Sequence, residues 1–124
     1  MRYMLLMYRD EKLWGELSRE EREAIYHQAV EFSEGLRKDG VFQAGDPLHL
    51  TSTATTVRLK NGKTITTDGP FAETKEQLGG YYLLDCKDLD EAIDASSKMP
   101  VGEGSVEIRP LMLFDDEGRP SQPV

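Results

Sequence analysis

The chain opens with an almost unbroken apolar run. Residues 2–8 contain, in succession, Tyr3, Met4, Leu5, Leu6 and Met7. A continuous run of this length is typical of a strand that is central in a sheet or covered on both faces. We therefore expect the first strand here, in the interior of a sheet.

A helical pattern follows from residue 18. Ser18 and Glu21 have the spacing of a capping box, in which each side chain binds a free backbone N–H at the start of a helix. Gly40 follows the charged residues Arg37 to Asp39 and marks the end. The apolar positions recur at steps of four, three and four, which gives a single stripe: Ile25, Ala29, Phe32 and Leu36.

The middle of the chain predicts strands. Residues 41–44 can form a second strand, which the turn residues Gly45 to Pro47 would end. In residues 55–60 polar and apolar positions alternate, and Asn61-Gly62 is the favoured two-residue turn before residues 63–67. This segment therefore predicts a β-hairpin.

The last third repeats the order strand, helix, strand. We expect strands at residues 80–84 and 106–114, separated by a helix that Asp88 and Glu91 begin and Pro100 stops. The residues expected on the inner face of this helix are Leu89, Ala92, Ile93 and Ser96.

The whole order predicts an α+β fold. It is a ferredoxin-like split βαβ arrangement with an inserted β-hairpin, in which helices cover one face of an antiparallel sheet. A single domain would occupy residues 1–114, and the polar tail, residues 115–124, would be flexible or form an arm onto a partner.

Charge and cysteine usage narrow the class of protein. With 23 acidic and 15 basic residues the net charge is −8, which disfavours direct binding to nucleic acid. No apolar run approaches the roughly 20 residues of a membrane span, and the first run reads as a strand instead of a signal peptide. The single cysteine, Cys86, cannot form an internal disulfide, which fits a reducing cytoplasm. Asp85 and Asp88 would raise the pKa of its thiol, so a structural role is expected.

The sequence TDGPFAETKE, residues 67–76, is the most distinctive segment. An Asp that begins a turn usually accepts a hydrogen bond from the backbone N–H two residues on, but here that residue is Pro70, which has none. The carboxylate of Asp68 must reach the N–H of Phe71, bind elsewhere or remain in water. Gly69 is expected to be extended, and Phe71 to anchor the turn in a core.

Four segments together resemble a known family. DGPFAETKEQLGGYYLLD, TATTVRLKNGK, VEIRPLM and YMLLMY are similar to the DGPF-type branch of the YCII-related proteins, over residues 1 to about 113. The resemblance implies a ferredoxin-like subunit of a dimeric α/β barrel, in which two sheets pair face to face around a cleft. It also implies a largely uncharacterised family, whose genes often lie beside those of extracytoplasmic-function sigma factors.

The resemblance raises the question of a catalytic dyad. The best-described YCII-related proteins carry a histidine, on the first helix, and an aspartate proposed to act together. His27 lies on the expected first helix but points about 190° away from its apolar stripe, so we expect it at the surface. His49 follows the second strand and could pair with Asp68, although the sequence does not give their distance.

Further candidates are ligand-binding residues. Tyr82, Arg58 and Lys75 could contact a small molecule, although charged residues after a turn are often only solvated or paired. Tyr81 and Tyr82 are adjacent on a strand, so at most one of them can face a given cleft. No motif indicates a metal or a cofactor.

Two functions remain open. One is a small-molecule enzyme that uses cofactor-free acid–base chemistry, with Asp68 and His49 or a tyrosine moving a proton near the DGPF segment. The other is a non-catalytic ligand-binding or accessory module associated with a sigma-factor regulator. Both would be homodimers.

Overall fold

A four-stranded antiparallel sheet forms the body of the protein. The computed structural model describes residues 1–121. The main sheet has the order β2-β5-β1-β6, built from Phe42–Pro47, Gln77–Asp85, Arg2–Arg9 and Gly104–Pro110. All three strand pairs are antiparallel, so β1 and β2 run in the same direction with β5 between them. This is the predicted split βαβ arrangement, with β1 in the interior.

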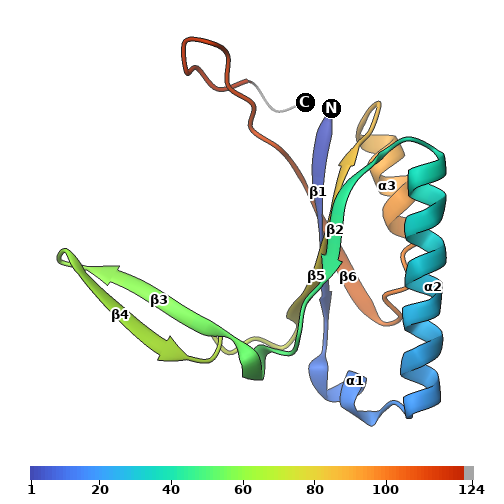
Figure 1. Ribbon diagram of the computed structural model, residues 1–124, viewed down its shortest axis with the longest axis horizontal. Helices are drawn as coiled ribbons and strands as arrows, with labels where there is room; N and C mark the ends of the chain where they lie inside the picture. The colour runs from blue at the N-terminus through green and yellow to red at the C-terminus, as the bar shows by residue number, and fades with distance from the viewer. Residues whose placement is uncertain (122–124) are drawn as a thin grey trace.

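Helices cover one face of this sheet. The long helix α2 (Arg19–Lys38) and the shorter α3 (Leu89–Ser97) lie side by side on that face, and α1 (Glu11–Glu16) lies near the end of β1 (Figure 1). The core between the layers contains Tyr3, Leu5, Leu36, Tyr82, Leu84, Cys86, Ala92 and Met99. Burial raises the pKa of the Cys86 thiol, with Glu91 and Asp85 adding to the effect, as expected for a structural cysteine.

The predicted hairpin forms a sheet of its own. Strands β3 (Thr55–Lys60) and β4 (Lys63–Asp68) pair only with each other, and they project from the face opposite the helices (Figure 1). At the tip Asn61 and Gly62 have φ values of 51° and 73°, the positive angles of the expected tight turn. The hairpin is therefore an arm beside the main sheet and adds no strand to it.

Helix caps match the sequence. The Ser18 side chain accepts a hydrogen bond from the N–H of Glu21, and the Glu21 carboxylate accepts one from the N–H of Ser18. The stripe Ile25, Ala29, Phe32 and Leu36 is half-buried or buried, as predicted. Asp88 caps α3 by accepting from the N–H of Glu91.

The inner face of α3 differs from the prediction. Ala92 is buried and Ala95 packs against the core, but Leu89 is 44% exposed and Ile93 is 49% exposed. Small residues face inward because this short helix lies close to the sheet, so the two larger side chains remain outside. The prediction that Leu89 and Ile93 point inward was wrong.

Several boundaries also differ. Strand β5 begins at Gln77 instead of residue 80, and β6 ends at Pro110 instead of residue 114. Proline lacks the N–H that would continue the ladder, which accounts for the early end of β6. The sequence analysis did not identify α1 or the 3-10 turn at Thr51–Thr53. Both are too short to show a periodic pattern.

The segment after β6 leaves the sheet on the same side as the hairpin (Figure 1). Within it, Asp115 accepts hydrogen bonds from the N–H groups of Glu117 and Arg119 and pairs with the Arg119 guanidinium. Phe114 and Pro120 form an isolated bridge. The predicted polar tail is thus a small turn as far as Ser121, and residues 122–124 lie outside the described part.

The described part of the chain has no helix that is long and apolar enough to cross a membrane.

Leu84 provides a test of the core. It is 0% exposed at the centre of the packed cluster, so Leu84→Ala should lower the free energy of unfolding by about 2 to 5 kcal/mol, the cost of a buried cavity. Urea denaturation followed by circular dichroism measures this difference. The matched control is Leu89→Ala on α3, where the leucine is 44% exposed and the expected change is below about 1 kcal/mol. Equal effects of the two substitutions would contradict this assignment of the core.

Candidate functional site

The loop that joins β4 to β5 contains the distinctive sequence. This β4–β5 loop, residues 69–76, begins at Gly69, whose φ is +105°, a conformation that L side chains rarely adopt. Apart from its two chain neighbours, no described residue has an atom within 4 Å of where a β-carbon would stand on Gly69, so the backbone angle alone requires glycine here. Gly69 therefore has a backbone angle that glycine adopts at little cost, whereas other residues would be strained there.

Hydrogen bonds from the hairpin fix the start of this loop. The N–H of Gly69 donates to the carbonyl of Ala54 over 2.8 Å, and the Thr56 hydroxyl donates to the carbonyl of Gly69 over 2.7 Å. The Arg58 guanidinium donates to the carbonyl of Phe71 over 2.8 Å. Arg58, a predicted ligand-binding residue, thus holds the loop in place.

Phe71 does not anchor the turn in the core. Its side chain is 73% exposed, because the hairpin carries the loop away from the body of the protein and the core lies out of its reach. The prediction of a buried Phe71 was wrong for the single chain.

Asp68 is the last residue of β4, opposite Thr55, and its side chain is exposed. Within residues 1–121 its carboxylate accepts no hydrogen bond, from Phe71, His49 or any other residue. Pro70 has no N–H, so this carboxylate could bind the N–H of Phe71, bind elsewhere or remain in water. In the single chain it remains in water.

A hollow lies at the root of the hairpin. It has a volume of about 680 Å³ and opens between the 48–57 segment and the β4–β5 loop; we call it the root hollow. His49 lies on its wall, two residues after the end of β2, together with Pro70 and Phe71 of the loop. The fold therefore brings His49 and the distinctive loop to one site, but Asp68 does not line it.

The lining of the root hollow combines apolar and hydroxyl groups. Leu48, Leu50 and Phe71 are 44%, 46% and 73% exposed, which leaves apolar surface uncovered. Several threonines, among them Thr51 and Thr74, add hydroxyl groups. A hollow with apolar walls and a few polar groups is the usual form of a small-molecule site.

Side-chain hydrogen bonds fix the root itself. The Glu11 carboxylate accepts from the backbone N–H of Thr51 over 2.9 Å and from its hydroxyl over 2.5 Å. The N–H of Glu11 donates to the Gln77 side chain, which in turn donates to the carbonyl of Thr74. Helix α1, the 3-10 turn and the start of β5 are thereby joined. Sequence analysis missed Glu11 and Gln77 because their partners are 40 and 66 residues away.

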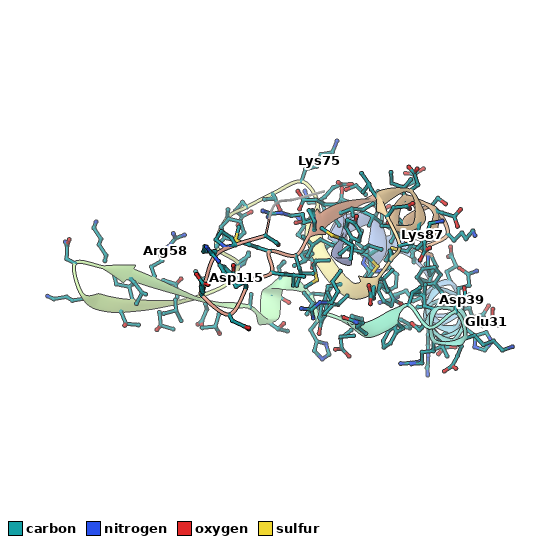
Figure 2. All side chains as sticks on the ribbon, turned by 90° about the horizontal axis from the view of Figure 1, so that it is seen from above. Glu31, Asp39, Arg58, Lys75, Lys87 and Asp115 are labelled. Atoms are coloured by element: carbon teal, nitrogen blue, oxygen red, sulfur yellow. The ribbon has the colours of Figure 1, made fainter. Side chains whose placement is uncertain are left out.

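The remaining predicted ligand-binding residues lie elsewhere. Lys75 is exposed and points outward from the β4–β5 loop (Figure 2). Tyr82 is 6% exposed and faces α2, where its hydroxyl lies 2.8 Å from the Ser33 hydroxyl. The adjacent Tyr81 faces the other side of the sheet and donates to Asp46 over 2.9 Å, a bond that raises the pKa of Tyr81. Neither tyrosine lines the root hollow.

The other histidine is at the surface. His27 lies on α2 with 78% of its side chain exposed, 3.4 Å from Glu31, as its position opposite the apolar stripe predicted. Within residues 1–121, no three histidine, cysteine or acidic side chains gather in a group that could hold a metal ion.

The bond from Arg58 to Phe71 gives a prediction for the loop. Arg58→Gln should free the β4–β5 loop and increase its cleavage in limited proteolysis several-fold, because a free loop reaches a protease more often. The fragments can be identified by mass spectrometry. Lys60→Gln, two residues along the same strand and on the same face, is the control and should leave the cleavage rate unchanged. If both variants are cleaved at the wild-type rate, the Arg58 bond does not hold the loop.

Comparison with known proteins agrees with this architecture. Residues 1–115 match the model of the YCII-related domain. A relative from Rhizobium meliloti (strain 1021), "Uncharacterized protein R00369", is 40% identical over 124 residues, which cover 98% of this chain and 100% of the relative. This chain therefore belongs to the family of proteins with a YCII-related domain.

Proposed function

We propose that this protein binds a small organic molecule in the root hollow and that His49 transfers a proton to or from it. The observation that carries the proposal is the position of His49. It is exposed on the wall of the hollow, which Phe71 of the β4–β5 loop also lines, and it is the one titratable side chain among the described residues that line this hollow. Histidine is the side chain best suited to proton exchange near neutral pH.

The rigidity of the root supports this proposal. A binding site works best when its walls are held by bonds that do not depend on the ligand. Here the Glu11 carboxylate and the Gln77 amide hold Thr51 and Thr74, which both line the hollow. The ligand would therefore meet two walls that are already ordered, while the exposed side chains of His49 and Phe71 adjust to it.

A second candidate function is binding without catalysis. The position of Asp68 favours it, because this carboxylate lies outside the hollow and within residues 1–121 makes no hydrogen bond to His49. A proton relay through both residues would require a rearrangement of the hairpin. The link to a sigma-factor regulator, which the family resemblance implies, stays a prediction that a pull-down from the native host can test.

We further infer that two copies associate through the open face of the sheet. Met4, Leu6, Tyr81 and Leu83 alternate with the buried residues of β1 and β5, so they point away from the helices. A solvated face of an antiparallel sheet is normally polar, whereas this one is apolar at its centre. The face is flanked by the hairpin and by the segment after β6, which both project on that side (Figure 1).

The exposed residues of the two arms support a second copy as the occupant. The hairpin and its loop expose Leu59 and Phe71, and the segment after β6 exposes Met112 and Phe114, each at more than 60%. Monomeric proteins rarely leave so many large apolar side chains together in water. The hairpin and the segment after β6 of one copy would then pack against the sheet of the other copy and cover the root hollow.

The role of His49 can be tested with a fragment screen. Ligand-observed NMR with a library of small carbonyl compounds should find binders that lose about tenfold in affinity in His49→Gln, the loss expected from about 1.4 kcal/mol. His27→Gln is the control, because this second histidine lies exposed on α2, where it pairs with Glu31. Fragments that bind equally well to all three proteins would rule out a site at His49.

The two candidate functions differ in proton exchange. A bound carbonyl fragment with an acidic C–H should exchange that hydrogen for deuterium faster in the presence of the protein if His49 transfers protons, and the acceleration should vanish in His49→Gln. Exchange at the buffer rate despite tight binding would favour the non-catalytic role.

Association can be measured by light scattering at micromolar concentration. We expect a mass of twice the 14.0 kDa chain, and Leu6→Arg should give a monomer because it places a charge at the centre of the open face. Leu89→Arg, on α3, is the control and should remain dimeric. Circular dichroism shows whether each variant is folded. A wild-type protein that remains monomeric contradicts the inference.

A further inference from the structure

A second cavity lies between α2 and the sheet. It has a volume of about 300 Å³, at the lower end of the range of small-molecule sites. Its walls come from the inner face of α2, the ends of β1 and β2, the start of β5 and the turn after α3. We call it the α2 cavity. Its lining shares no residue with that of the root hollow.

Most of the wall is apolar. Met7, Ile25, Val30 and Val101 contribute aliphatic side chains, and Tyr82 contributes a ring that is itself held between Phe32 and Phe42. Val30 is 59% exposed although it lines the cavity. A ligand with an apolar body would cover this surface.

Arg9 places a fixed positive charge in this wall. The guanidinium carbon of Arg9 lies 4.0 Å from the centre of the Trp14 ring, and Trp14 is 7% exposed, so the stacking fixes the plane of the guanidinium. The Arg9 guanidinium fits against Gly79 because this residue has no β-carbon. A β-carbon at position 79 would lie 3.0 Å from Nε of Arg9 and 3.3 Å from Nη2. A larger residue at 79 would displace this side chain.

In the described part of the chain, no carboxylate binds the Arg9 guanidinium directly. Among residues 1–121 Arg9 takes part in no ion pair. The nearest candidate in sequence, Glu11, uses its carboxylate to hold Thr51. Partial burial lowers the pKa of Arg9, and the smaller opposite effects of Tyr26 and Glu11 do not cancel it, although the guanidinium remains charged. A half-buried cation without an anion is costly, and an anionic ligand would remove that cost.

The geometry points to a small organic monocarboxylate as the ligand of the α2 cavity, with its apolar body against Ile25, Val30 and Val101 and its carboxylate on the Arg9 guanidinium. The planar fork of arginine matches a carboxylate in a bidentate contact. A single unpaired cation balances one negative charge, and the net charge of −8 disfavours ligands with more. The Ser33–Tyr82 hydroxyl pair, also in the wall, offers a further hydrogen bond.

Isothermal titration of the full-length protein with matched probes tests this assignment. Benzoate and hexanoate should bind at least about tenfold more tightly than benzyl alcohol and hexanol, which have the same apolar bodies without the charge. This comparison uses the unmodified protein, so it does not depend on the folding of a variant. Carboxylates that bind no better than the alcohols, or not at all up to about 10 mM, would overturn the proposal.

Three variants test the role of Arg9. Arg9→Met should abolish the preference for carboxylates, and Arg9→Lys should retain part of it, because lysine keeps the charge but loses the planar fork. Arg37→Met is the matched control, since Arg37 lines the same cavity but is paired with Glu34 at 3.2 Å and stacks on Phe42. It should leave the affinity within about twofold. An unchanged preference in Arg9→Met would contradict the assignment.

Backbone NMR separates this site from the root hollow. On addition of benzoate, the amide signals of Ala29 and Gly79 should shift, while those of Ala54 and Ala72 stay in place. Shifts confined to Ala54 and Ala72 would overturn the α2 cavity as the site and leave the proposed function intact. Failure of the fragment screen at His49 would leave this cavity unaffected.

Discussion

The central strand β1 presents apolar side chains to both faces of the sheet, whereas the chain supplies helices for only one of them. Tyr3 and Leu5 are buried beneath the helices, and Met4 and Leu6 point to the other side. Burial of apolar surface is the dominant favourable term in folding. An apolar sheet face that stays in water is therefore unfavourable, and covering it with another segment or a second molecule would be favourable. Both projecting arms leave the sheet on this side (Figure 1). The open apolar face is therefore the face that the hairpin and the segment after β6 flank.

The two hollows offer different chemistry. The root hollow offers an exposed imidazole and hydroxyl groups, with walls that hydrogen bonds to Glu11 and Gln77 hold in place. The α2 cavity offers a fixed cation in an apolar wall. The end of β2 and the start of β5 lie beside both hollows, because Pro47 and Gly79 line the α2 cavity while their neighbours Leu48 and Leu78 line the root hollow. Such an arrangement allows one small domain to carry two independent recognition sites.

Much of the fold could be predicted from the sequence because its signals are local. The capping box at Ser18, the stripe on α2 and the Asn61-Gly62 turn each depend on residues within a few positions of one another, and each is confirmed. The alternation of predicted strands and helices indicated the split βαβ arrangement, and the family resemblance implied the same fold. The exposure of Phe71, Leu89 and Ile93 could not be predicted, because it depends on where whole elements dock. The pairing of Glu11 with Thr51, and the stacking of Arg9 on Trp14 beside Gly79, likewise join segments that only the folded chain brings together.

The hairpin closes its backbone hydrogen bonds on itself and shares none of its ladder with the main sheet. A residue inserted in β3 or β4 would therefore shift the register of two strands only and would leave the pairing of β1, β5, β2 and β6 as it is. Related chains can then lengthen, shorten or recompose this arm without refolding the body that bears it. The hairpin also forms one wall of the root hollow. Changes in its length or sequence would therefore alter what this hollow binds, while the strand pairing of the body stays the same.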